Sequence, residues 1–331
     1  MLAAVIPAGG VTGSGGDDFF AETGIANVLI RAPLGELHRN PGKAVPVPGT
    51  IEIDQGPRVP VTCEAYGLSR LRECEIPPMH IRLAQGAPGT RQLDGRCALR
   101  LVAPCSGHGN RDRHAVLEYL VYAGYEMLTE PALGVRLARV RLVDTAEDHE
   151  RAEGYGFFVE DIRDVAARHG LQWRDTPPAS LAELDAVQLT LMTLFQFMVG
   201  NTDWSAVRGP GSEPCCHNVA FLVGAQGPGM VLPFDFDQSG LVGAPYAAPS
   251  PELDIRDVRQ RVFRGFCEHN RLLPSAIAVL NRRRPDLEAL FSSPDLPYPK
   301  DRKRALRYIE EFYEIVNDPE KFQKQIVSRC R

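Results

Sequence analysis

Hydrophobic and polar residues alternate over much of the first third of the chain, which is the pattern of half-buried β-strands. Short runs of this kind cover 59–65, 79–84 and 98–103, and glycine and proline clusters separate them. We therefore predict β-structure from 28 to 103. Residues 1–27 are rich in small side chains and lack the helix that a phosphate-binding glycine loop requires, so they predict a flexible tail.

Helical spacing appears next, where apolar residues recur every three or four positions over 113–128. This pattern predicts one helix, and two more strands are expected at 135–143 and 155–159. Farther on, Ser180 and Glu183 have the spacing of a capping box, which predicts the start of an apolar helix that ends at Gly200. Further helices are predicted at 251–269, 274–283 and 301–317.

Composition excludes several classes of protein. Hydrophobic residues make up 44% of the 331 residues and charged residues 24%, as in ordinary globular proteins. The net charge of -5 gives no reason to expect a nucleic-acid partner. No apolar run reaches the roughly 18–20 residues that a membrane span needs. Only five residues are lysine, and none of them lies between 44 and 299.

Three short polar segments carry the candidate chemistry. Gly200-Asn-Thr-Asp203 follows the predicted apolar helix, His217-Asn218 comes about 15 residues later, and Pro233-Phe-Asp235-Phe-Asp237 follows a predicted hairpin. Phosphoryl transfer needs a carboxylate that orients the attacking hydroxyl and oxygen ligands that hold Mg²⁺ on the phosphates. The three segments supply these groups in that order.

These segments resemble bacterial relatives of the spore-coat (CotH-like) kinases, and the Gly-Asn-Thr-Asp run is more distantly similar to HipA-type kinases. The resemblance covers 28–331. It implies an α+β, two-lobed protein-kinase-like fold. We expect the tail at 1–27, a small β-rich N-lobe with one helix at 28–160, and a larger helical C-lobe at 161–331.

The resemblance also implies roles for individual residues. Asp203 would be the catalytic base, Asn218 and Asp235 the metal ligands, and Asp237 a candidate auxiliary ligand. Mg²⁺ (or Mn²⁺) and ATP are the implied cofactors. Trp204 is expected to pack beside Asp203 rather than to bind substrate.

The expected phosphate-binding cation departs from the kinase pattern because no lysine is available in the core. Glu118, on the predicted helix, would pair with that cation. Arg100 stands where a lysine would be expected, and Arg82 on the preceding strand is the second candidate, with Lys43 the only lysine in reach. Since arginine is bulkier than lysine, either the nucleotide sits differently or activity is lost.

Two further contacts with a nucleotide follow from the resemblance. The loop Gly67–Arg72 takes the place of a glycine-rich loop, and Arg70 and Arg72 could hold phosphates there because guanidinium binds them bidentately. The segment Val159-Glu160-Asp161-Ile162 would be a hinge that contacts the adenine.

The function expected from these residues is ATP- and Mg²⁺-dependent phosphoryl transfer to a hydroxyl of an unknown protein or small molecule. Two alternatives stay open. One is a pseudokinase that binds a nucleotide or a partner without turnover. The other is an enzyme that transfers a different group, such as AMP or an amino acid.

Eight cysteines are many for a cytosolic enzyme of this size. We predict at least two disulfides, with Cys267–Cys330 and then Cys74–Cys105 as the favoured pairs, while buried free thiols are the alternative. A periplasmic or secreted location is favoured over a cytoplasmic one, and it would count against ATP as the donor. Zinc binding by Cys215, Cys216 and His217 is disfavoured because adjacent ligands cannot easily surround one ion. A hydrolase centred on Ser106 is disfavoured because no G-x-S-x-G elbow occurs.

Overall fold

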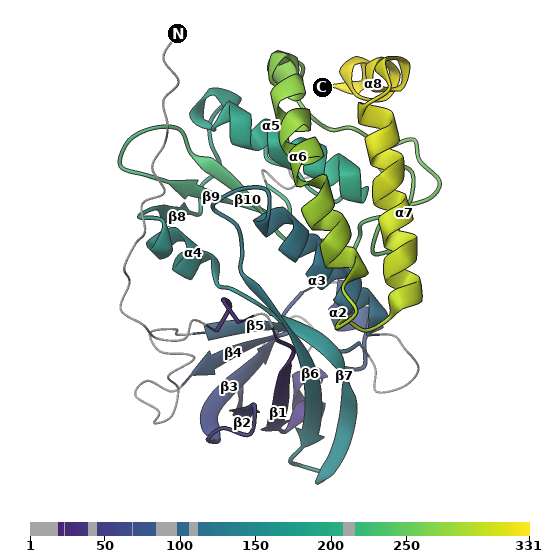
Figure 1. The fold of residues 1–331 in the computed structure, drawn as a ribbon. Helices are drawn as coiled ribbons and strands as arrows, with labels where there is room; N and C mark the ends of the chain where they lie inside the picture. The colour runs from purple at the N-terminus through teal and green to yellow at the C-terminus, as the bar shows by residue number, and fades with distance from the viewer. Residues whose placement is uncertain are drawn as a thin grey trace.

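The computed structural model describes residues 19–22, 24–38, 45–67, 69–83, 98–105, 112–207 and 216–331. Figure 1 shows strands β1–β7 gathered at one end of the molecule and helices α5, α6 and α7 at the other. Helix α3 lies between these two parts. The first half of the chain therefore supplies one wall of the region between the two ends, and the second half supplies the other.

Seven strands form a closed barrel in the order β1-β2-β3-β4-β5-β7-β6. All neighbouring pairs are antiparallel except β1 and β6, whose parallel pairing runs from Ala26 opposite Ala138 to Ala32 opposite Asp144. This pairing joins the two edges of the sheet. The strands are β1 (Ala26–Ala32), β2 (Val47–Ile53), β3 (Val59–Ala65), β4 (Met79–Leu83), β5 (Ala98–Val102), β6 (Val135–Asp144) and β7 (His149–Val159).

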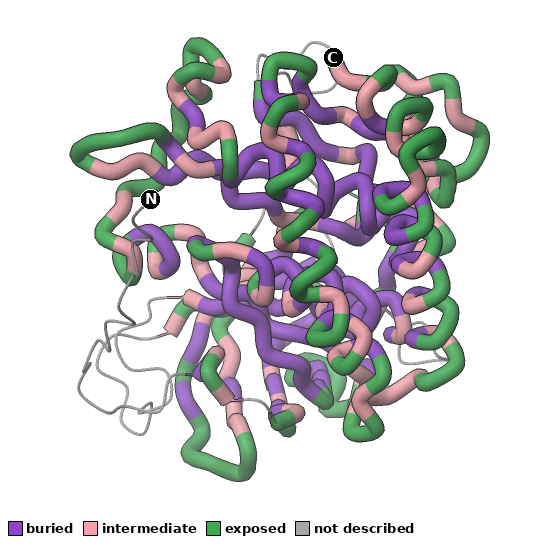
Figure 2. Tube along the Cα trace, turned by 45° about the horizontal axis from the view of Figure 1, so that its top comes forward, coloured by how far each residue is buried: buried purple, intermediate pink, exposed green. Residues whose placement is uncertain are grey.

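The barrel is filled by the apolar side chains that alternate along its strands. In β1, Ala26 and Val28 are buried while the intervening Asn27 is exposed, as expected where successive side chains point to opposite faces. These side chains and their counterparts on the other strands form one apolar cluster, which Phe19 and Phe158 complete. Figure 2 shows the buried positions along the strands and the exposed ones at the hairpin tips.

A second apolar cluster joins the barrel to the helices. It contains the buried side of α3, residues at the ends of β6 and β7, and most of α5. The described α-helices are α1 (Leu34–His38), α2 (Ser69–Glu73), α3 (Arg113–Glu126), α4 (Ile162–Arg168), α5 (Ala186–Val199), α6 (Leu273–Ser292), α7 (Pro299–Val316) and α8 (Pro319–Gln325).

The second half of the chain also contains a small antiparallel sheet, in the order β10-β9-β8. Its strands are β8 (Gln172–Arg174), β9 (Val219–Val223) and β10 (Met230–Pro233). The first polar segment follows α5, the second immediately precedes β9, and the third follows β10. The sheet therefore fixes two of the three polar segments relative to each other.

The prediction of a two-lobed protein-kinase-like fold with one helix in a small N-lobe is wrong. The strands close into a mixed seven-stranded barrel instead of forming an open sheet. Two more helices, α1 and α2, accompany the barrel strands besides α3. Closure depends on parallel pairing between β1 and β6, which lie more than 100 residues apart, and hydrophobic alternation within a strand carries no information about such a partner.

Two predicted helical features are also corrected. Helix α5 begins at Ala186, because the Asp185 side chain accepts hydrogen bonds from the N–H groups of Val187 and Gln188, both at 2.9 Å. The Ser180 side chain makes no capping bond, so the predicted capping box is wrong.

The predicted helix at 251–269 does not form. This segment consists of turns followed by an extended stretch, and only a 3-10 helix begins at Cys267. The Arg261 Nε donates to the Met198 carbonyl at 3.4 Å, and the Arg264 guanidinium donates to the Thr202 carbonyl. We attribute the extended conformation to these bonds to distant carbonyls.

Both favoured disulfides, Cys74–Cys105 and Cys267–Cys330, are confirmed. The first ties the end of α2 to the segment after β5. The second lies beside a short backbone pairing, in which Cys267 N–H donates to the Arg331 carbonyl at 3.1 Å. Cys63 is a free, buried thiol inside the barrel, and burial raises its pKa to about 11. Cys97, like Lys43 and residues 1–18 of the predicted tail, lies outside the described residues.

Candidate functional site

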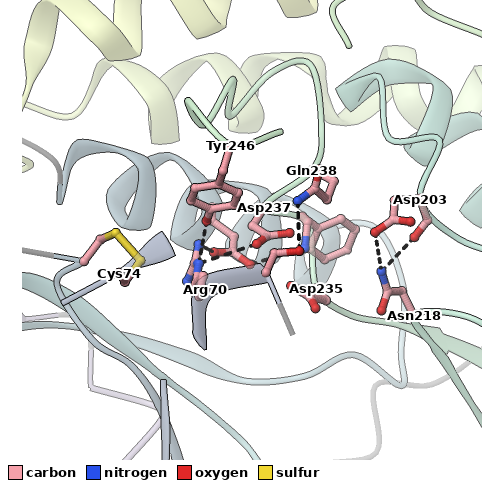
Figure 3. A network of polar contacts seen from close by, with 12 residues as sticks. Arg70, Cys74, Asp203, Asn218, Asp235, Asp237, Gln238 and Tyr246 are labelled. Carbon is pink, nitrogen blue, oxygen red and sulfur yellow. Dashed lines mark hydrogen bonds and ion pairs between the residues drawn. A yellow bond between two sulfur atoms is a disulfide. The ribbon is translucent and has the colours of Figure 1, made fainter. Parts of the chain in front are cut away.

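A cavity of about 610 Å³ lies between the barrel and the helical half of the chain. The three polar segments identified from the sequence all reach it. Figure 3 shows Arg70, Asp237 and Tyr246 together at one end of the polar network, Asp203 with Asn218 at the other, and Asp235 between them. The described residues that line the cavity with charged side chains are Arg70, Arg100, Glu118, Asp203, His217, Asp235, Asp237 and Glu252.

The loop that carries Asp203 is fixed by its own side chains. Helix α5 ends at Gly200, whose φ of 65° is the left-handed conformation that glycine adopts without strain. The Asn201 Oδ1 then accepts the Asp203 N–H at 2.9 Å. Trp204 is buried, and its Nε1 donates to the Asn201 carbonyl at 3.1 Å, so Trp204 packs behind the loop. The Asp203 side chain stays 37% exposed and faces the cavity.

Asn218 and His217 both contact Asp203. The Asn218 Nδ2 donates to the Asp203 carbonyl at 2.8 Å and to its Oδ2 at 3.1 Å. The His217 Nε2 lies 3.0 Å from the Asp203 Oδ1. Because the Asn218 nitrogen is turned toward Asp203, its amide oxygen points elsewhere and is available to a ligand in the cavity.

Asp235 follows β10 and occupies the middle of the cavity wall. Its φ of 59° is left-handed, a conformation that aspartate tolerates better than most residues. The Asp235 N–H donates to the Tyr122 hydroxyl at 2.7 Å, and the adjacent Phe236 is fully buried as an anchor. Burial raises the pKa of the Asp235 carboxyl well above its ordinary value, and the nearby charges of Asp237 and Glu118 raise it further.

Arg70 lies at the centre of a buried polar network, at the end of the cavity opposite Asp203. Its guanidinium pairs with the Glu118 carboxylate, and its Nε donates to the Tyr246 hydroxyl at 2.7 Å and lies 3.6 Å from Asp237 Oδ2. The second Glu118 oxygen accepts the Phe236 N–H at 3.2 Å. Burial raises the pKa of Glu118 although the Arg70 charge opposes the shift. The network therefore connects α2 and α3 to the backbone beside Asp235.

The expected ion pair between Arg100 and Glu118 is not formed, because Arg70 occupies Glu118. Arg100 enters the cavity from β5 with its guanidinium 5.3 Å from the centre of the Tyr66 ring and 5.5 Å from that of Phe234. Both distances suit cation–π contacts. Among the described residues, the buried Arg100 Nε has no hydrogen-bond partner. Arg100 is thus held in the cavity wall by two aromatic rings.

Three predicted nucleotide-contacting residues do not line the cavity. Arg82 is exposed and pairs with Glu64 at 3.0 Å, because its neighbours in the strand take the inward positions. Arg72 is exposed on α2, on the side away from Arg70. Glu160 is buried, where it accepts the Gly134 N–H at 3.1 Å and pairs with Arg168 at 2.7 Å. Of the predicted hinge, Val159 does line the cavity.

Sequence reasoning missed the tyrosines of the site and the contact between His217 and Asp203. Tyr122 lies four residues after Glu118 on α3, a spacing that places both side chains on one helix face, so this signal was available. Tyr66 and Tyr246 carry no comparable signal. Tyr246 reaches Arg70 from 176 residues away.

No group of three or more His, Cys, Asp or Glu side chains in the described part of the chain could hold a metal ion. A cation bound here would therefore need ligands besides these carboxylates. Asp235 and the Asn218 amide oxygen fit that requirement, because Mg²⁺ commonly takes one or two protein carboxylates and completes its shell with phosphate oxygens and water.

Comparison with protein-family models found no matching family, and comparisons with curated proteins and with solved structures found no match in either. Among the described helices, none is both long and apolar enough to cross a membrane. Function is therefore argued from the site.

Proposed function

We propose that this chain is a phosphotransferase that uses ATP with Mg²⁺ or Mn²⁺ and transfers a phosphoryl group to a hydroxyl of a protein or small molecule. The observation that carries the proposal is the convergence of Asp203, Asn218 and Asp235 on one cavity that also contains Arg100. The resemblance of the three loop segments to CotH-like kinases is a second support.

The cavity has room for a nucleotide and a mixed lining that suits one. Its volume of about 610 Å³ is within the range of small-molecule sites. Tyr66, Pro78, Val102 and Val159 give one part of the wall an apolar, partly aromatic surface for a base. Arg100 and Asp235 lie nearer the polar segments, where phosphates and a cation would be held.

In the proposed reaction, Asp203 accepts a hydrogen bond from the acceptor hydroxyl and orients it toward the terminal phosphate. The hydroxyl oxygen forms a bond to phosphorus as the bond to ADP breaks, and the hydroxyl proton passes to Asp203. Asp235 and Asn218 would hold the cation, which neutralises phosphate charge. Arg100 binds phosphate oxygens as the transferred charge develops.

Thermal stabilisation by ATP with Mg²⁺ or Mn²⁺, followed by mass measurement of a modified acceptor, tests the proposal. Asp235→Asn should remove the metal-dependent part of the stabilisation. Arg100→Gln should weaken nucleotide binding about tenfold or more. Arg82→Gln is the matched control, because Arg82 is an exposed arginine on the adjacent strand and should bind as the wild type does. No stabilisation by any nucleotide would overturn the proposal.

Nucleotide binding without turnover is a second candidate function. It is favoured by the lack of any lysine between 44 and 299 in the sequence and by the separation of Arg100 from the Glu118 carboxylate, which Arg70 occupies. Thermal stabilisation by the nucleotide, with no change in the mass of any acceptor tested, would select this candidate. The two disulfides support an oxidising location, periplasmic or secreted, where ATP is scarce. Transfer of AMP or an amino acid would be identified by the mass added to the acceptor.

A further inference from the structure

We propose that His217 is a positioning residue that fixes the Asp203 carboxylate in the orientation that receives the acceptor hydroxyl. This inference rests on the proposed function, since it assigns Asp203 the role described above. The carrying observation is that two consecutive residues, His217 and Asn218, hold the two oxygens of one carboxylate from different sides.

The backbone conformation of this segment explains how two consecutive side chains can meet one partner. In an extended strand, neighbouring side chains point to opposite faces. Asn218 has a φ of 50°, in the left-handed region, and this breaks the alternation immediately before β9. Such conformations are uncommon outside glycine and concentrate at functional sites.

The main chain holds the same arrangement. The Ser205 N–H donates to the His217 carbonyl and the His217 N–H donates to the Ser205 carbonyl, both at 2.9 Å. This isolated pair of bonds fixes the loop after α5 against the segment before β9. Because the two segments are held together, the imidazole Nε2 lies 3.0 Å from Asp203 Oδ1.

This positioning matters because the Asp203 side chain is 37% exposed, and a partly exposed side chain samples several rotamers. The Asn218 side chain alone could not fix it, because its nitrogen contacts only the Oδ2 atom of the carboxylate. With His217 donating to Oδ1 and Asn218 to Oδ2, the carboxylate plane is set, and its remaining lone pairs face the cavity. Loss of such positioning can cost on the order of a hundredfold in rate.

The experiment compares His217→Leu with His217→Gln, in which the amide nitrogen can replace the donor at Nε2. With MgATP and an acceptor, His217→Leu should lower kcat by about ten- to a hundredfold with the Kd for MgATP unchanged. His217→Gln should recover most of the loss. His149→Leu is the matched control, because His149 also lies beside a carboxylate, Glu147 at 3.4 Å, but on an exposed hairpin.

The outcomes separate this inference from the proposed function. If Asp203→Asn abolishes turnover while His217→Leu keeps it, the positioning role is overturned and the proposed function stands. If Asp203→Asn turns over like the wild type, the proposed function fails. The ¹⁵N NMR spectrum of the His217 imidazole ring gives a second measurement that does not depend on turnover, because it reports which ring nitrogen carries a proton. A proton on Nε2 supports the positioning role, and an unprotonated Nε2 overturns it.

Discussion

The two ends of the cavity use charged side chains in opposite ways. At the α2 end, Arg70 is matched by Glu118, Asp237 and the Tyr246 hydroxyl, and the three charged side chains are buried while Tyr246 is partly buried. At the other end, Asp203 is half-exposed, and its partners there are an imidazole and an amide rather than a guanidinium.

This difference indicates which end of the cavity stabilises the fold and which end can bind a ligand. A buried charge that is already paired gains little from a ligand, and removing its partner leaves an unpaired charge. A carboxylate that faces a cavity without a full counter-charge can attract a cation or orient a hydroxyl. Arg70, expected from the sequence to bind phosphate, therefore belongs to the structural end, and Arg100 belongs to the ligand-binding end.

The largest expected effect is on the structural end. Arg70→Met should lower the free energy of unfolding by about 3–5 kcal/mol at pH 8, because it leaves the buried Glu118 and Asp237 carboxylates without their partner. Urea denaturation measures this change. Arg72→Met, two residues along and exposed, is the control and should stay within about 0.5 kcal/mol of the wild type. Equal effects in the two variants would contradict the division between the ends.

The disulfide at the same end should have the next largest effect. Replacing both Cys74 and Cys105 by serine removes a link with a sequence separation of 31, which should cost about 3 kcal/mol. Because Cys74 N–H donates to the Arg70 carbonyl at 3.0 Å, α2 should loosen and expose Arg70. Hydrogen exchange of α2 checks this consequence. Unchanged exchange there, despite a lower melting temperature, would show that the disulfide does not hold Arg70 in place.

Glu160 extends the comparison to a carboxylate outside the cavity. Glu160→Gln should cost about 1–2 kcal/mol, because the buried carboxylate accepts from the Gly134 N–H and pairs with Arg168. The affinity for MgATP, measured by calorimetry, should not change. A weakened affinity at unchanged stability would restore the predicted adenine-contacting role.

The smallest effect, and one of opposite sign, is expected at Asp235. Burial, with Asp237 and Glu118 nearby, raises the pKa of Asp235 in the folded protein. The associated stability is fully present below the ordinary pKa of aspartate and is lost as the pH rises through the folded-state value. Asp235→Asn cannot ionise, so it should be more stable than the wild type at pH 8.

Urea denaturation between pH 4 and pH 8 measures this difference. The wild type should lose more stability than Asp235→Asn over that range, while the two should converge near pH 4. Parallel pH profiles would mean that Asp235 ionises in the folded state as easily as it does in the unfolded chain.

Local patterns predicted the elements of the fold better than their assembly. The strand at 59–65 and the helix at 113–128 form with ends within about two residues of those expected, while the apolar helix before Gly200 ends where expected but begins at Ala186. The closure of the barrel was missed because it depends on which strands meet. The helix predicted at 251–269 does not form, and we attribute this to arginine contacts with remote carbonyls that override helical spacing.

The same limit applies to the site. Asp203, Asn218 and Asp235 could be brought together from sequence because short loops next to regular elements carry them. The partner of Glu118 could not, because Arg70 lies on α2, a helix of five residues that is too short to give a periodic signal. Nor does spacing reveal that Arg100 would be held between Tyr66 and Phe234.

The disulfide between Cys267 and Cys330 turns α6, α7 and α8 into a covalently closed ring, with a sequence separation of 63 between its two cysteines. One peptide-bond cleavage inside this ring would open the chain without releasing a fragment. The Arg331 guanidinium, just past the ring, lies 5.7 Å from the Trp204 ring, beside Asp203. A protease cut in α7 would therefore leave this end of the chain tethered behind the Asp203 loop, and the two fragments would separate only when the disulfide is reduced.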